Sequence, residues 1–265
     1  MSLQITAIAA FEDNYIWMLQ QRDTPETVVV DPGDANVVLE SLRACDARLT
    51  DILITHHHPD HTGGIPALRE HFPAVRVYGP RNERIRGLTH HVANHQRISV
   101  LGTEFRVLEV PGHTLDHVAY FSNHYNIGIQ PIVFSGDTLF SAGCGRLREG
   151  TPSQLMNSLH TLAALPPETL VYCTHEYTLS NLRFALHVEP DNIACQHRMA
   201  ECLRMRQNGL PTLPSTIATE LRTNPFLRCR SDDLSAIIRT QFGPDHVSEL
   251  DVFTQLRRWK DGFTG

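Results

Sequence analysis

A dense cluster of histidines at the end of an apolar run constrains this chain more than any other feature. The run Asp51-Ile52-Leu53-Ile54 leads into Thr55-His56-His57-His58-Pro59-Asp60-His61-Thr62-Gly63-Gly64, so four imidazoles and one carboxylate fall between positions 55 and 61. In extended backbone, side chains two residues apart share a face, and His56 and His58 can therefore converge on one ion. This spacing is typical of a metal site.

The rest of the motif indicates a second ion. Asp60 and His61 are adjacent, so they diverge unless the chain turns, and Pro59 together with Gly63-Gly64 favours a turn. Imidazoles and a carboxylate, without a thiolate, suit zinc, iron or manganese better than a closed structural zinc site. The alternative is a solvent-exposed histidine tract. Such a tract needs neither the Asp-His completion nor a strand before it, so the metal site is the better interpretation.

Three other apolar runs also end in a potential ligand. Residues 107–110 lead to His113, residues 131–135 lead to Asp137, and residues 170–173 lead to His175. Such runs are typical of buried strands, and loops at one edge of a sheet are where enzymes of this kind place their chemistry. Alone, His113 or His175 would be interpreted as a hydrogen-bonded structural histidine. Four segments with the same pattern predict one shared site.

The order of the elements divides the chain into two parts. Strands are predicted at 3–9, 15–20, 27–31, 52–55, 75–78, 105–110, 118–122, 132–135 and 170–173, with helices at 35–44, 65–72 and 152–165. After Tyr177 the apolar residues follow helical spacing, and Ser231 is predicted to cap a helix. A final helix would carry Val247, Leu250, Phe253 and Leu256 on its apolar face. The strand-rich part predicts a two-sheet sandwich with outer helices.

Composition excludes several classes of protein. A net charge of −6 argues against a nucleic-acid partner, which normally requires a basic surface. No apolar run approaches the roughly 20 residues of a membrane span, and the first residues do not resemble a signal peptide. The six cysteines are scattered without a C-x-x-C pair, as expected of reduced thiols. We therefore expect a cytoplasmic protein with no membrane contact, and a monomer.

The motifs resemble those of a known family. The His56 motif followed by single His, Asp and His residues at strand ends resembles the metallo-β-lactamase superfamily. Over nearly the whole chain the sequence is similar to the hydroxyacylglutathione hydrolase (glyoxalase II) family, and the similarity is carried by residues 11–15, 112–114, 136–140, 143–150, 174–178, 224–228 and 257–261. The resemblance implies an α+β protein: an αββα sandwich over 1–175, followed by a small helical substrate-binding domain over 176–265.

The same resemblance implies a ligand set and a reaction. His56, His58 and His113 would bind one divalent ion, Asp60, His61 and His175 a second, and Asp137 would bridge them, with zinc favoured over iron or manganese. Two cations about 3.5–4 Å apart repel strongly, so a shared carboxylate between them is physically sensible. A hydroxide shared by the ions would attack a thioester carbonyl, with Asp60 and Asp137 as catalytic residues. A thiolate leaving group, with a conjugate-acid pKa of about 8.5, makes a general acid less necessary.

The implied substrate is a glutathione thioester. The family hydrolyses S-2-hydroxyacylglutathione, such as S-lactoylglutathione, to glutathione and a 2-hydroxy acid such as D-lactate during methylglyoxal degradation. Its glutathione contacts map onto Arg146, Tyr177, Arg257 and Lys260, and the last two are three residues apart and share a helix face. Without the resemblance, those two residues would be interpreted as a solvated basic helix end. Arg148 departs from the family, whose members usually have an aromatic residue there.

Other residues near the motif have less defined roles. By alternation His57 points away from His56 and His58, and we expect a structural role. Thr55, Asn14 and Cys173 are candidates for orienting the ligands, whereas Cys144 and Cys173 are not expected to be nucleophiles.

Three other functions fit parts of the pattern. A mononuclear iron persulfide dioxygenase would share many ligands but not the C-terminal motifs, and a nuclease of the superfamily would be expected to have a basic surface. A relative that had lost catalysis would be expected to lack some of the metal ligands, and all seven are present in this sequence.

Overall fold

The structure is a computed structural model that describes residues 3–123, 130–245 and 248–265. The chain forms two compact units. Unit 1 consists of Met1–Glu109, Asp116–Gly136 and Tyr172–His175, and unit 2 consists of Val110–Leu115, Asp137–Val171 and Glu176–Gly265. The chain therefore passes between the units several times. The unit that contains the His56 motif is not one continuous stretch of sequence.

Unit 1 contains a six-stranded sheet with the order β1-β2-β3-β4-β5-β6. The antiparallel part comprises β1 (Leu3–Ala10), β2 (Asn14–Gln21) and β3 (Glu26–Val30), and the parallel part continues through β4 (Arg48–Leu53), β5 (Arg76–Pro80) and β6 (His90–Val92). Val28, Val29, Ile52 and Leu53 are completely buried. Such β-branched and aliphatic runs are typical of strands covered on both faces.

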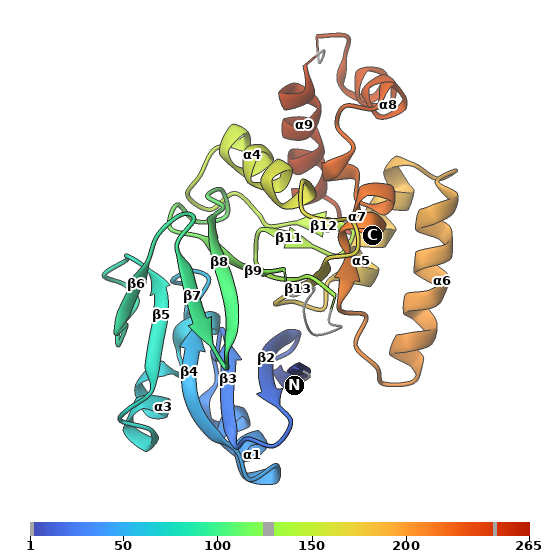
Figure 1. Cartoon of the computed structure of the whole chain (residues 1–265). Helices are drawn as coiled ribbons and strands as arrows, with labels where there is room; N and C mark the ends of the chain where they lie inside the picture. The colour runs from blue at the N-terminus through green and yellow to red at the C-terminus, as the bar shows by residue number, and fades with distance from the viewer. Residues whose placement is uncertain (1–2, 124–129, 246–247) are drawn as a thin grey trace. The chain divides into compact units, whose positions relative to one another are not determined.

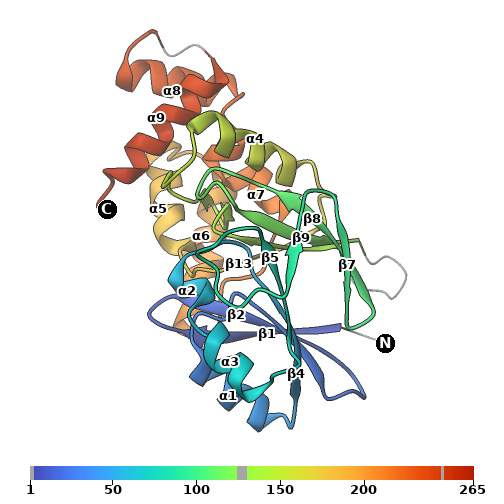
Figure 2. The ribbon, with the colours of Figure 1, turned by 90° about the vertical axis from the view of Figure 1, so that its left-hand side faces the viewer.

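Helices α1 (Ala35–Ala44) and α3 (Ile65–His71) pack against this sheet, beside it in Figure 2. Helix α1 begins at Asp34, whose side chain accepts a hydrogen bond from the Asn36 amide. Val38 and Leu42 of α1 and Leu68 of α3 join Val29 and Ile52 in one core cluster. Burial of these side chains holds the strand ends, and the loops that follow them, in fixed positions.

A second set of strands in unit 1 has the order β10-β9-β8-β7. These antiparallel strands are β7 (Arg97–Val100), β8 (Thr103–Glu109), β9 (Val118–Ser122) and β10 (Ile132–Gly136). The buried Tyr120 hydroxyl of β9 donates to the carbonyl of Ile54, directly after β4, at 2.8 Å. The Val118 amide at the start of β9 donates to the Thr55 carbonyl at 2.9 Å, so β9 begins beside the histidine motif.

Unit 2 is mostly helical, and Figure 1 labels its α-helices. It contains the short strands β11 (Leu139–Phe140), β12 (Gly143–Cys144) and β14 (Ser215–Thr216), and the helices α4 (Pro152–Ala163), α5 (Thr178–Val188), α6 (Ile193–Gln207), α7 (Ile217–Thr223), η2 (Pro225–Leu227), α8 (Asp232–Phe242) and α9 (Glu249–Asp261). Strand β13 (Leu170–Cys173) belongs to both units, since Leu170 and Val171 pair with β14 whereas Tyr172 and Cys173 are part of unit 1.

Most predicted elements form as expected, and the differences have simple causes. Ser231 caps α8 as predicted, and the final helix begins at Glu249, while Val247 lies outside the described residues. The prediction of a strand at 52–55 was wrong in its bounds: β4 is Arg48–Leu53, and Thr55 follows it. The polar residues Arg48 and Thr50 conceal the beginning of that strand. Strand β6, a paired element with two exposed histidines, was missed because it has no apolar run.

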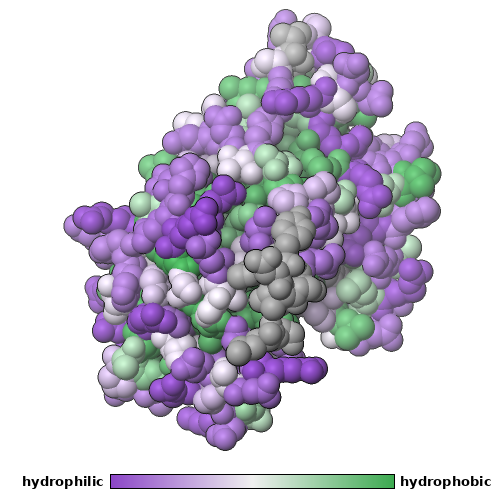
Figure 3. All heavy atoms as spheres, viewed as in Figure 1, coloured by the Kyte–Doolittle hydropathy of each residue, from purple (hydrophilic) through white to green (hydrophobic). Residues whose placement is uncertain are grey.

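Apolar side chains are largely interior. Hydrophilic residues cover most of the face shown in Figure 3, and hydrophobic residues appear in smaller areas between them. Among the described residues, no helix combines the length and the apolar character needed to cross a membrane.

Candidate metal centre and substrate site

The turn expected after His58 is a short helix, α2 (Pro59–Thr62), with Pro59 in its first turn. A proline is well suited to this place because its fixed φ matches a helix and its missing N–H is not needed there. Gly33 packs directly on this helix: a Cβ at that position would lie 1.9 Å from the Asp60 carbonyl oxygen. The close approach fixes the orientation of Asp60 and His61.

Two histidines of unit 1 converge on the Asp60 carboxylate. Nε2 of His61 lies 3.4 Å from Asp60 Oδ2, and Nε2 of His175 lies 3.5 Å from the same oxygen. The ligand atoms of the three residues all lie within 4.8 Å of one another. Both histidine side chains are buried, whereas that of Asp60 is 39% exposed. One carboxylate and two imidazoles facing one point are a suitable donor set for a divalent ion.

The second ring nitrogen of each histidine is held by another carboxylate. His61 Nδ1 lies 3.0 Å from Asp31 Oδ2, and His175 Nδ1 lies 2.7 Å from Asp13 Oδ1. An ionised carboxylate only accepts hydrogen bonds, so Nδ1 carries the hydrogen in both rings and Nε2 presents its lone pair. Metal-binding histidines are commonly oriented in this way. The rings are therefore preset in the tautomer that binds a metal.

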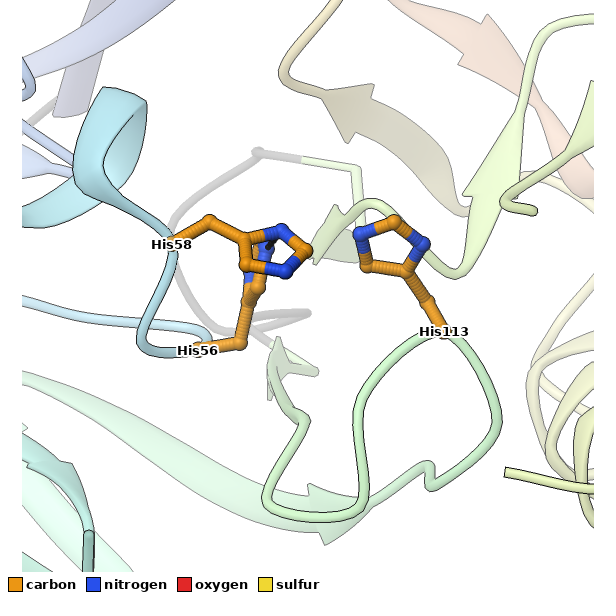
Figure 4. Close-up of side chains that lie close together, drawn as sticks. All are labelled: His56, His58 and His113. Atoms are coloured by element: carbon orange, nitrogen blue, oxygen red, sulfur yellow. Dashed lines mark hydrogen bonds between the residues drawn. The ribbon is translucent and has the colours of Figure 1, made fainter. Parts of the chain in front are cut away.

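His56 and His58 lie together in the loop after β4, as Figure 4 shows. His56 Nε2 is 3.0 Å from His58 Nδ1, and His56 Nδ1 is 3.1 Å from the Thr55 hydroxyl. His117 stacks on the His56 ring at 4.6 Å and is also completely buried. This contact and the Thr55 hydrogen bond limit rotation of the His56 ring.

His57 has a different environment from its neighbours. Its Nδ1 lies 2.9 Å from Asp116 Oδ1, and Asn82 donates to the other oxygen of that carboxylate at 2.8 Å. His57 is therefore part of a partly buried network with residues of two other loops.

The remaining two predicted ligands, His113 and Asp137, lie in unit 2. His113 is drawn with the loop after β8 in Figure 4. Its Nδ1 lies 2.8 Å from the Arg146 carbonyl oxygen, which fixes the hydrogen there, and its Nε2 lies 3.5 Å from Asp137 Oδ2. Asp137 follows Gly136, whose φ of 49° is in the left-handed region that favours glycine.

The β11–β12 hairpin, which follows Asp137, is held by hydrogen bonds to buried side chains of the C-terminal part of the chain. Four side chains bind backbone groups of the β11–β12 hairpin: Asn181 the Ser141 carbonyl (3.0 Å), Glu220 the Ala142 amide (2.7 Å), Asn224 the Phe140 and Gly143 carbonyls (3.3 and 2.9 Å) and Arg257 the Cys144 carbonyl (3.0 Å). Burial raises the pKa of Glu220. The sequence motif around Asn224 is thus explained by its contact with this hairpin.

The predicted glutathione contacts are all in unit 2 but differ in exposure. The Arg146 side chain is 62% exposed, 3.7 Å from Asp261, and Tyr177 is 36% exposed with its ring edge on Phe140. Lys260 Nζ lies 3.2 Å from the Ser180 carbonyl oxygen. Burial, followed by the nearby Arg257 and Arg146 charges, lowers the pKa of Lys260 to about 8.

Arg257 is only 3% exposed, in contrast to the basic helix end that its sequence position suggests. Besides Cys144, its guanidinium binds Asp261 at 2.9 Å and lies over the Phe226 ring. Arg148 is exposed, and its backbone amide donates to the His113 carbonyl at 3.2 Å.

The sequence suggested Thr55 and Asn14 as orienting groups, and both contact predicted ligands. Asn14 Nδ2 donates to Asp60 Oδ2 at 3.1 Å, and the Thr55 hydroxyl lies 3.1 Å from His56 Nδ1. Sequence reasoning missed Asp31 and Asp13. Asp31 also accepts from the amide and hydroxyl of Thr55, at 2.8 and 2.7 Å. It follows the apolar strand β3, so the rule that identified Asp137, a carboxylate directly after a buried strand, would have found it.

Comparisons with known proteins cover both parts of the sequence. Residues 12–175 match the model of the metallo-β-lactamase superfamily, and residues 176–263 match the model described as "Hydroxyacylglutathione hydrolase C-terminus". A hydroxyacylglutathione hydrolase from Pseudomonas aeruginosa is 52% identical over 262 residues, which are 98% of this chain and 100% of that protein. One from Xanthomonas campestris pv. campestris is 49% identical over 261 residues, 98% and 99% of the two chains.

Solved structures agree on the fold. ETHE1 from Myxococcus xanthus is 27% identical with a TM-score of 0.64, covering 92% of this chain and 93% of that one. The BLEG-1 B3 metallo-β-lactamase is 25% identical with a TM-score of 0.61, covering 85% and 99%. The predicted fold class is confirmed: an α+β metallo-β-lactamase domain followed by a helical C-terminal domain. The chain belongs to the hydroxyacylglutathione hydrolase family of the metallo-β-lactamase superfamily.

Proposed function

We propose that this protein is a metal-dependent thioester hydrolase that cleaves S-2-hydroxyacylglutathione, such as S-lactoylglutathione, to glutathione and a 2-hydroxy acid such as D-lactate. Family membership supports this substrate class. The structural observation that carries the proposal is the convergence of His61 and His175 on Asp60, with both rings fixed through Nδ1. The biological role would be the removal of methylglyoxal.

The proposed ligand set contains seven residues. His56, His58 and His113 would hold one divalent ion and Asp60, His61 and His175 the other, with Asp137 between them. Three observations support this set: the 3.0 Å contact of His56 with His58, the Asp60 cluster, and the 3.5 Å contact of His113 with Asp137. Imidazole and carboxylate donors without thiolate favour zinc, and also accommodate iron or manganese.

Bound divalent ions in such a site activate water as a nucleophile near neutral pH and polarise a carbonyl oxygen. The chain itself orients the donors. Asn14 holds the Asp60 carboxylate, the Arg146 carbonyl holds His113, and Gly145 packs against Asp137, since a Cβ there would lie 1.9 Å from the Asp137 carbonyl oxygen. Asp60 and Asp137 are proposed as the catalytic carboxylates. The thiolate of glutathione can leave without a protein acid because it is only weakly basic: a thiol has a pKa of about 8.5.

Glutathione would be bound by Arg146, Tyr177, Arg257 and Lys260. Arg146 and Lys260 are cations with partly exposed side chains, suited to carboxylates of a solvated substrate. Arg257 would contribute chiefly through the Cys144 carbonyl that it holds, because its side chain is buried. Arg148, exposed beside Glu149, supplies a guanidinium where relatives are expected to have an aromatic ring.

The proposed division of labour is a catalytic domain over 1–175 and a substrate-binding domain over 176–265. The two matching family models, which meet between residues 175 and 176, support it. We also place the protein in the cytoplasm as a monomer without nucleic-acid or membrane partners. None of the six cysteines, all of which lie in the described residues, forms a disulfide, which suits a reducing compartment.

Elemental analysis combined with a hydrolysis assay tests this function. The purified protein should hold two metal equivalents and hydrolyse S-lactoylglutathione, and a chelator should abolish both properties. A single equivalent of iron after reconstitution, without thioester hydrolysis, would instead indicate the mononuclear dioxygenase.

A further inference from the structure

The turn between β1 and β2 places two adjacent side chains on two ligands of the same proposed ion. Asp13 Oδ1 lies 2.7 Å from Nδ1 of His175, and the neighbouring Asn14 donates to Asp60 Oδ2 at 3.1 Å. The ligands come from distant parts of the sequence, α2 and the end of β13. A single turn therefore connects them.

Backbone contacts fix the same turn against His175. The Tyr15 amide donates to the Thr174 carbonyl at 2.6 Å, and Asn14 forms an isolated antiparallel bridge with His175. These contacts set the distance between the Asp13 carboxylate and the His175 ring independently of either side chain.

The start of the turn is also constrained. Phe11 has a φ of 52°, a conformation that bulky residues rarely adopt and that usually persists where the surroundings impose it. Its ring borders Gly33, where a Cβ would lie 2.9 Å from Phe11 Cε2 and 1.9 Å from the Asp60 carbonyl oxygen. The turn therefore also packs against Gly33, which itself contacts the Asp60 backbone. The Phe11 side chain is nevertheless 59% exposed.

From this arrangement we infer that the β1–β2 turn, through Asp13 and Asn14, selectively sets the affinity of the ion held by Asp60, His61 and His175. The inference rests on the proposed function, and it assigns Asp13 and Asn14 as positioning residues. His56 and His58 are oriented by other contacts, with Thr55, His117 and each other. Damage to the turn should therefore empty one metal position and spare the other.

The test measures metal stoichiometry. Wild type, Asp13→Ala, Asn14→Ala and the control Glu12→Gln are loaded with Zn²⁺, dialysed against a series of zinc buffers and analysed for bound zinc. Glu12 lies in the same turn with an exposed side chain, so the control removes a charge without touching a ligand contact. Orienting partners of metal ligands typically contribute about 10–100-fold in affinity. Each alanine variant should weaken one zinc equivalent by that factor and leave the other unchanged.

Asp13→Asn distinguishes orientation of the ring from folding of the turn. The asparagine amide oxygen can still accept from His175 Nδ1, so this variant should weaken the same equivalent less than Asp13→Ala does. If an alanine variant fails to fold, Asp13→Asn still tests whether the contact with His175 sets the affinity for zinc. A titration with Co²⁺, followed by visible absorption, should show two steps, of which only one moves in the variants.

The outcomes separate this inference from the proposed function. If wild type holds two zinc ions and hydrolyses the thioester but the turn variants keep both ions, or lose both together, the selective role of the turn is wrong and the function stands. If wild type itself holds fewer than two ions and does not hydrolyse the thioester, the proposed function fails.

Discussion

The donors of unit 1 and the cations of unit 2 are held in contrasting ways. His61 and His175 are short, buried side chains, each fixed at its second ring nitrogen by a carboxylate. Arg146 and Lys260 are long side chains with partly exposed charges. Arg146 forms a 3.7 Å ion pair with Asp261, and Lys260 Nζ contacts Ser180 and the rings of Phe184 and Phe263. These two proposed metal ligands are thus fixed by carboxylates, whereas these two proposed glutathione contacts lie closer to solvent. Substitutions in the two regions should therefore affect different kinetic constants.

The largest expected effect is on turnover, from the two proposed catalytic carboxylates. Asp60→Asn and Asp137→Asn should each lower kcat by more than about 100-fold, because a ligand should matter more than the groups that orient it. His57→Ala should leave the metal content close to wild type, since that ring pairs with Asp116. If His57→Ala empties a position as fully as His58→Ala does, the assignment of ligands by alternation fails.

The next effect concerns a residue that only orients a ligand. Asp31→Ala removes the acceptor of His61 Nδ1 and of two groups of Thr55. Zinc affinity should fall about 10–100-fold, and the free energy of unfolding of the metal-free protein by about 1–3 kcal/mol, because buried donors lose their partner. Zinc-buffer titration and urea unfolding measure the two quantities. A variant with wild-type zinc affinity would show that His61 needs no orienting carboxylate.

The cations of unit 2 should act on KM. Lys260→Gln should raise KM for S-lactoylglutathione up to about 10-fold and leave kcat near wild type, as expected of uniform binding remote from the reacting carbonyl. The effect should shrink at high ionic strength, since exposed charges are screened over about 8–10 Å. A thioester of a neutral thiol serves as the control substrate. Equal losses on both substrates would remove the case for a glutathione site.

Arg257 sharpens this contrast because it is basic but buried. Arg257→Lys keeps the charge and loses the fork that binds Cys144 and Asp261, so we expect a free energy of unfolding lower by about 1–3 kcal/mol. Its kinetic effect should include kcat, through the loop that supports His113. Thermal unfolding and steady-state kinetics of this variant and Lys260→Gln, measured side by side, check the difference. If Arg257→Lys changes KM alone, Arg257 is a direct substrate contact.

The smallest effect is a pH dependence. Burial and neighbouring arginines lower the pKa of Lys260 to about 8, so its charge is complete well below that pH and is lost above it. KM for the glutathione thioester should therefore rise a few-fold between pH 7 and 9. In Lys260→Arg the guanidinium stays charged, and this rise should be smaller. A rise of equal size in both proteins would assign the titration to another group.

The sequence predicted the strands before the ligands because buried strands carry continuous apolar runs, as in Val28–Val30 and Ile52–Leu53. The turn at Pro59 was also predicted from a local feature, because proline fixes its φ angle. The fold class followed from the family resemblance and is confirmed by the comparisons.

What the sequence did not predict depends on distant partners. Asp13 and His175 are 162 residues apart, and no local pattern connects them. The burial of Arg257 was missed because an arginine near a helix end normally remains in water, and only the fold reveals the Cys144 carbonyl that it binds. Strands β11 and β12, with two residues each, are too short to produce a periodic signal.

The interleaving of the two units has a consequence for protein synthesis. Unit 1 needs Tyr172–His175, yet the ribosome makes Asp137–Val171 of unit 2 before that segment. At about 5–20 residues per second, strands β1 to β10 are made a few seconds before His175 is added. During this interval His56, His58 and His61 are present without their last partner. Complete metal loading in the cell should accordingly follow the synthesis of His175. A translation pause between residues 137 and 171 should lengthen the exposure of the unfinished site to proteases and adventitious metals.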